Sequence, residues 1–118
     1  MSTIAKPEAA QALQVAKTAS QNGGVLYLAG ACQTLTVVIE GDATTSGGTI
    51  AIEEAFYRQE VDPYYAGTWS NIQTVNASDV SGGKQFVIHA NGSFWAVRTR
   101  IATDITGGGT VSTWAWGS

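Results

Sequence analysis

Apolar and polar residues alternate with a period of two along most of the chain. In one run Leu35, Val37 and Ile39 fall on one face, opposite two threonines. Because successive side chains of a strand point to opposite faces, this period indicates strands with one buried face. The pattern predicts seven strands, with turn signals between them. They are residues 25–29, 33–40, 49–56, 69–75, 84–90, 93–102 and 110–116.

Residues 11–20 fit two structures. Their alanines, followed by Asn22 and Gly23 as a stop signal, would suit a short helix. Leu13 and Val15 alternate with polar neighbours, however, which favours a strand. Residues 1–10 hold a proline and little apolar bulk, and we predict that they form an N-terminal arm. The expected organisation is an arm, 1–10, and a single domain, 11–118.

The spacing of these strands predicts the fold class. Turn signals recur without a helical segment between the later strands, which argues for two packed antiparallel sheets. About eight strands, counting residues 11–20, suit an all-β, jelly-roll-like antiparallel sandwich. The composition also favours an all-β fold, because the β-branched residues Val and Ile, which are common in strands, number 18 against 4 Leu residues.

The strand pattern also assigns faces. Trp95 alternates with Val97 and Ile101, so we expect its ring in the core. Glu54 falls on the apolar face of its strand, where it would sit at the sheet rim or pair with an arginine. Asn91 and Gly92 form a strong β-hairpin signal, since both tolerate positive φ.

The net charge and the scarcity of reactive residues exclude several classes of function. Only 15 of the 118 residues are charged and the net charge is −3, which argues against nucleic-acid or anionic-membrane partners. A single cysteine (Cys32), a single histidine (His89) and no clustered carboxylates argue against an enzyme, a metal site or a cofactor. No run approaches the roughly 20 apolar residues of a membrane span, and no signal peptide is visible.

Aromatic and arginine residues are the remaining candidates for binding. Trp114 and Trp116 share one face of the last strand: they are either core residues or an outward patch that implies a partner. Arg98 and Arg100 alternate on another strand, where we expect them to bridge acids across a subunit boundary and to matter more for assembly than for the fold.

Two sequence stretches resemble a known family. One is residues 35–40 with the turn and strand that follow, through Glu54; the other is residues 94–101 with its Gly-rich turn and the last strand. Together they resemble small structural proteins of tailed bacteriophages, the head decoration or cement type, over about residues 11–116. The resemblance implies a jelly-roll-like sandwich, self-association and attachment to a capsid shell, and it aligns residues 11–20 with a first strand. The loop 57–68 is longer and more aromatic than the family pattern.

The resemblance and the missing chemistry together predict a virion structural protein. The expected role is a decoration protein that binds the major capsid protein lattice and stabilises the head, as a homo-oligomer that we expect to be a trimer. It would lie on the capsid surface, after synthesis in the host cytoplasm without export. The candidate interface residues are Ile4, Leu13, Val15, Tyr64, Tyr65, Arg98, Arg100, Trp114 and Trp116.

A carbohydrate-binding module of a phage tail or fibre protein is the alternative. Tyr64, Tyr65 and Trp69 would then stack on sugar rings, and Asp62 and Asn71 would bond hydroxyl groups.

Overall fold

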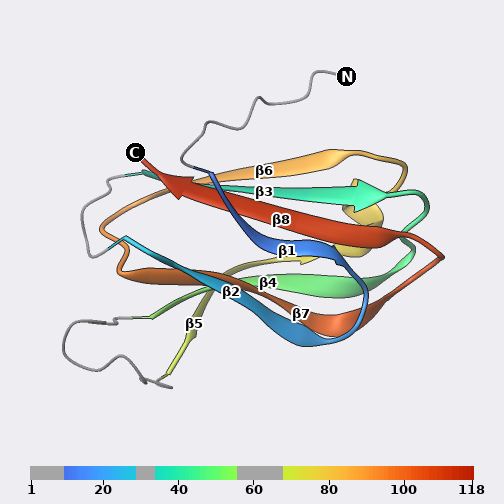
Figure 1. Ribbon diagram of the computed structural model, residues 1–118, viewed down its shortest axis with the longest axis horizontal. Helices are drawn as coiled ribbons and strands as arrows, with labels where there is room; N and C mark the ends of the chain where they lie inside the picture. The colour runs from blue at the N-terminus through green and yellow to red at the C-terminus, as the bar shows by residue number, and fades with distance from the viewer. Residues whose placement is uncertain (1–9, 29–33, 56–67) are drawn as a thin grey trace.

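A computed structural model describes residues 10–28, 34–55 and 68–118. These residues form eight β-strands and one short 3₁₀ helix, arranged as two packed sheets (Figure 1). The elements are β1 (Gln11–Lys17), β2 (Gln21–Tyr27), β3 (Thr34–Asp42), β4 (Gly47–Ala55), β5 (Ser70–Asn76), η1 (Ala77–Val80), β6 (Gln85–Asn91), β7 (Ala96–Thr106) and β8 (Thr110–Gly117).

Each sheet has four antiparallel strands. The strand order is β1-β8-β3-β6 in the first sheet, here called sheet A, and β2-β7-β4-β5 in the second, sheet B. Only β4 and β5 are both consecutive in the chain and neighbours in a sheet, so the other connections between strands pass from one sheet to the other. This is jelly-roll topology. The structure therefore confirms the predicted all-β antiparallel sandwich, and residues 11–17 are a strand rather than a helix.

Alternating side chains of both sheets form one core. Ile50 of β4 pairs with Ile101 of β7 in sheet B, and both are fully buried. Facing them across the sandwich are Leu35, Val37 and Ile39 of β3, which belong to the core cluster as the predicted alternation requires. Burying this many branched side chains provides the main stabilisation of a domain of this size.

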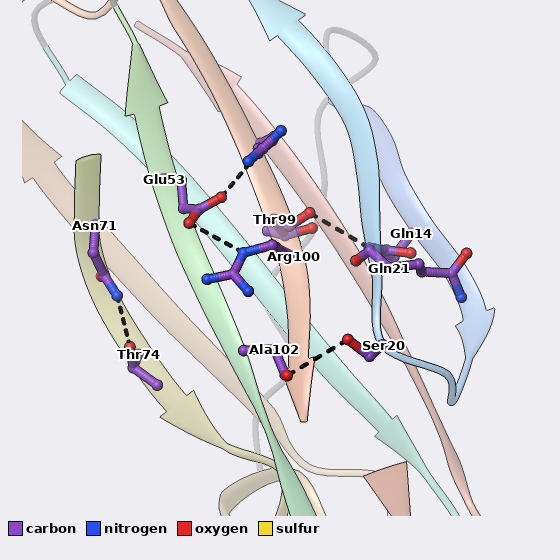
Figure 2. Close-up of polar contacts among 10 residues, drawn as sticks. Gln14, Ser20, Gln21, Glu53, Asn71, Thr74, Thr99, Arg100 and Ala102 are labelled. Atoms are coloured by element: carbon purple, nitrogen blue, oxygen red, sulfur yellow. Dashed lines mark hydrogen bonds and ion pairs between the residues drawn. The ribbon is translucent and has the colours of Figure 1, made fainter. Parts of the chain in front are cut away.

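The core also contains polar groups, each with a hydrogen-bond partner. The side-chain oxygens of Thr99 in β7 and Thr113 in β8 lie 2.7 Å apart and join the two sheets. Gln14, which is 3% exposed, donates from Nε2 to the backbone oxygens of Thr99 and Gln21 (Figure 2). Such pairing offsets the cost of burying polar groups.

Two glycines allow backbone segments to approach closely. A Cβ atom at Gly41 would collide with the backbone oxygen of Val80, which follows from the packing of η1 against β3. A Cβ atom at Gly109 would collide with the backbone oxygen of Asp42. These positions require glycine because of space rather than because of backbone angles.

Two local predictions are wrong. The core aromatic residue before β7 is Phe94, 5% exposed, whereas Trp95 is half-buried and outside the core cluster. The predicted hairpin at Asn91 and Gly92 is a crossing between sheets, because β6 pairs with β3 while β7 pairs with β2 and β4. Residues 92–95 are not in a strand, so the alternation restarts at Ala96.

Several predictions fall outside the described residues. These are the arm, apart from Ala10, the interface candidates Ile4, Tyr64 and Tyr65, the sugar-binding candidate Asp62, and also Cys32. Within the residues that the structure describes, no helix has the length and apolar character needed to cross a membrane.

Candidate interaction surfaces

The two C-terminal tryptophans lie on the outer face of sheet A. Their strand, β8, places Val111, Thr113 and Ala115 in the core, so the alternating Trp114 and Trp116 face outward. Trp114 is paired in register with Val38, and Trp116 with Thr36, both on β3. The choice that the sequence left open is thereby resolved in favour of the outward orientation.

This outer face is apolar at its centre. Val38 and Thr36 point away from the core, yet they are only 0% and 4% exposed. The outward residues of β6 include the half-buried Val87 and the exposed His89, and the imidazole Nδ1 of His89 lies 3.0 Å from the Thr36 hydroxyl. We call Thr36, Val38, Val87, Trp114 and Trp116 the tryptophan face.

The outer face of sheet B carries a three-residue ion-pair cluster. Glu53 on β4 lies opposite Arg98 on β7 in register, and Arg100 is two residues further along the same strand. Arg98 Nε donates to Glu53 Oε1 at 2.8 Å and Arg100 Nε donates to Glu53 Oε2 at 3.2 Å. Figure 2 shows the Glu53 carboxylate beside the Arg100 guanidinium group.

This cluster gives both arginines a partner within the chain. Glu53 is only 6% exposed, so its carboxylate needs the two positive charges to compensate for lost hydration. Glu54, which the alternation placed on the apolar face, is the penultimate residue of β4 and half-buried, and the arginine pair belongs to Glu53 instead. Contact of Arg98 or Arg100 with another subunit stays a prediction.

Trp69 contributes to the same face. The guanidinium carbon of Arg98 lies 4.2 Å from the centre of the Trp69 ring, within the range of a cation–π contact. The nearby Asn71 side chain donates to the Thr74 hydroxyl at 2.8 Å (Figure 2). Arg98 thus covers one face of the ring that the carbohydrate alternative would use, and the other two ring residues of that alternative, Tyr64 and Tyr65, lie outside the described residues.

The candidates on β1 have opposite environments. Leu13 is 5% exposed and belongs to the core, so its side chain does not reach the surface as an anchor would. Val15 is 58% exposed and remains available as a contact. The sequence could not separate them, because β1 carries bulges that break the alternation.

The described part of the chain contains no pocket. Within the same residues, no three His, Cys, Asp or Glu side chains are grouped so that they could hold a metal ion.

Comparisons with known proteins agree with the fold. No protein-family model matches the chain, and no curated protein sequence matches it. Among solved structures, the chain is similar to the crystal structure of SPBc2 prophage-derived protein YomS, with a TM-score of 0.58 and 17% sequence identity. The alignment covers 98% of this chain and 98% of that chain. At this identity the likeness shows a shared fold over the whole length.

Proposed function

We propose that this chain is a structural protein of a phage virion: a head decoration protein that binds the major capsid protein lattice and stabilises the head. Two observations support the phage assignment. The sequence resembles small phage structural proteins, and the fold is similar along its full length to a prophage-derived protein. The tryptophan face carries the more specific part of the proposal.

An apolar sheet face suits docking onto another protein surface. Two indole rings on one strand offer large contact area at little cost in side-chain entropy, and aromatic residues dominate binding energy at protein interfaces. The jelly-roll framework beneath them holds their strand on both sides, between β1 and β3. Trp116 is half-buried and paired in register with Thr36 of β3, so little ordering of its side chain is needed on contact.

Repetition on a lattice strengthens weak contacts. A capsid presents many identical sites, so an oligomer that engages several of them gains avidity without any new contact. We expect a homo-oligomer on the outside of the virion after synthesis in the host cytoplasm. The proposed role needs no catalysis, cofactor, metal, nucleic acid or membrane.

Co-sedimentation with capsids tests the proposal. Capsids assembled from the major capsid protein of the phage or prophage that encodes this chain would be mixed with the purified protein, and bound protein would be quantified at saturation. We expect stoichiometric binding and a higher temperature of capsid disassembly. Absence of binding would contradict the decoration role.

Two matched truncations locate the binding surface. Trp116→Ala removes an indole from the tryptophan face, and Trp69→Ala removes one from the opposite sheet. We expect Trp116→Ala to weaken capsid binding at least about tenfold, as for an interface hot spot, and Trp69→Ala to leave it unchanged. Equal losses of capsid binding from the two variants would show that the tryptophan face is not the specific contact.

A further inference from the structure

The four edge strands of the sandwich differ in how well they could accept another strand. The edges are β1 and β6 in sheet A, and β2 and β5 in sheet B. An edge strand presents backbone N–H and C=O groups in a row, and native proteins commonly disrupt such edges with bulges, charges or prolines. Whether an edge carries such a device therefore indicates whether it is protected.

Three of the edges are bulged in the edge strand itself. Along β1, the pairing with β8 shifts register twice, and Ala16 adopts a positive φ of 50°. Along β2, the register shifts between Asn22 and Val25, across two glycines. Along β5, Gln73 and Asn71 face consecutive residues of β4, so Ile72 is an extra residue. Bulges of this kind twist an edge and interrupt its hydrogen-bonding groups.

The fourth edge, β6, has none of these devices. All seven of its residues pair with β3 in one unbroken register. The strand has no proline, lysine, arginine, aspartate or glutamate. It forms the upper border of the sandwich in Figure 1, with no described strand beyond it.

The hydrogen-bond phase identifies which groups face outward along this edge. Gly41 N donates to Lys84 O, in the same register that pairs Ile88 with Val37. In an antiparallel pair, alternate residues direct both backbone groups to the same neighbour. Lys84, Phe86 and Ile88 therefore bond to β3, and the backbone groups of Val87 and His89 point to the open side.

We infer that the β6 edge is a self-association site, at which β6 of a second copy of this chain adds antiparallel about a two-fold axis at Ile88. In that register Val87 of each copy lies opposite His89 of the other, so the outward backbone groups of both residues meet. The two pairs exchange about four hydrogen bonds. The result is a continuous sheet that spans both copies.

The side chains along β6 are compatible with pairing to β6 of a second copy of this chain. On the core side Ile88 would meet itself and Phe86 would meet Ala90, which extends the apolar layer across the axis. On the outer side Val87 would meet His89, and no charged side chain of β6 opposes another. The tryptophan faces of the two copies would also join into one surface, since β6 and β8 flank β3 in sheet A.

Opposing charges at the two outward positions provide the test. Variant V87K/H89K places lysine opposite lysine in the pair, and V87E/H89E places glutamate opposite glutamate. Each variant alone should raise the dissociation constant of the dimer at least about tenfold, and an equimolar mixture should restore the dimer through unlike pairs. The control Q73K/N76K adds the same two charges at exposed positions of the bulged β5 edge and should leave association unchanged.

The readouts are solution mass and amide exchange. Sedimentation of the wild-type protein over a concentration series should show a species of twice 12.3 kDa. On dimerisation, hydrogen exchange should slow at the amides of Val87 and His89 and stay constant at Phe86 and Ile88, which are already bonded to β3. Far-ultraviolet circular dichroism confirms that each variant is folded.

Three results would each overturn the inference: a wild-type protein that stays monomeric, a mixture of variants that fails to recover the dimer, or oligomers without slower exchange at Val87 and His89. None of these experiments contains capsids. Failure of the edge contact is therefore distinct from failure of the decoration role, which co-sedimentation measures independently.

Discussion

The side-chain oxygens of Thr99 and Thr113 lie 2.7 Å apart between the two sheets, and both residues are fully buried. This is a polar contact at the centre of an apolar core, formed by residues 14 positions apart on consecutive strands of different sheets. One hydroxyl donates to the other across this distance, so the two residues are coupled.

Removal of one hydroxyl should cost more than removal of both. Thr113→Val leaves the Thr99 hydroxyl buried without this partner, and we expect a loss of about 1–3 kcal/mol in the free energy of unfolding. The double variant T99V/T113V replaces both groups by apolar ones of similar shape and should lose less than the single variant. Urea unfolding of the two singles and the double measures this coupling.

Thr103→Val is the matched control for the threonine pair. Thr103 lies on the same strand as Thr99 but is exposed, so its change should stay within about 0.5 kcal/mol. Additive losses from the two buried threonines would show that the hydroxyls do not depend on one another.

Glu53 should contribute more to the fold than its neighbour Glu54. Glu53→Gln removes the charge that compensates both arginines, and we expect a loss of about 1.5–3 kcal/mol in the free energy of unfolding. Glu54→Gln, the same change one position along β4, should have a smaller effect. Chemical denaturation of the two variants compares them directly, and equal losses would show that the ion pairs contribute little.

The two arginines should differ as well. Arg98 has a side chain 17% exposed, against 38% for Arg100, and it also lies over Trp69. Arg98→Ala should therefore destabilise the monomer more than Arg100→Ala, because exposed pairs are worth little in water. The sequence alone led us to expect effects mainly on assembly, and the contact with Glu53 now predicts an effect on the fold. A larger loss from Arg100→Ala would contradict this order.

Strand pattern and fold class could be predicted from the sequence because they depend on local alternation. Val37, Val97 and Ile101 are buried as the period of two requires. The ion-pair partners of Glu53, by contrast, could not be predicted from the sequence. Its pairing with Arg98 depends on β4 and β7 lying side by side with a particular register, and a single sequence does not contain that information.

Local errors arose where the alternation is interrupted. Asn91 and Gly92 carry the chemistry of a tight turn, but the chain uses that turn to cross between sheets rather than to return within one. The predicted strand 93–102 starts too early: β7 begins at Ala96, so the alternation that places Val97 in the core does not extend back to Trp95. This is why Trp95 was assigned to the core in place of Phe94.

Truncation of these two aromatic residues should have unequal effects. Phe94→Ala leaves a cavity in the core, and we expect a loss of about 3–5 kcal/mol in the free energy of unfolding. Trp95→Ala removes a larger but half-buried ring, and it should cost less. Thermal unfolding of the two variants tests the assignment, which a greater loss from Trp95→Ala would reverse.

Gly109 should be intolerant of even one methyl group. It lies in the turn before β8, where its N–H donates to Thr44 O at 2.9 Å. A Cβ atom there would collide with the backbone oxygen of Asp42 at the end of β3. Relief of the collision requires β3 and the turn to separate, and we expect Gly109→Ala to cost at least about 2 kcal/mol in the free energy of unfolding.

Gly24→Ala separates this steric cost from the general effect of replacing a glycine. The nearest atom to a Cβ at Gly24 is Leu13 O at 3.8 Å, an ordinary contact. Alanine there should be neutral or stabilise by up to about 1 kcal/mol, because it restricts the unfolded chain. Urea unfolding of both variants gives the comparison. If Gly109→Ala were as stable as Gly24→Ala, the close approach between the β7–β8 turn and β3 would not exist in solution.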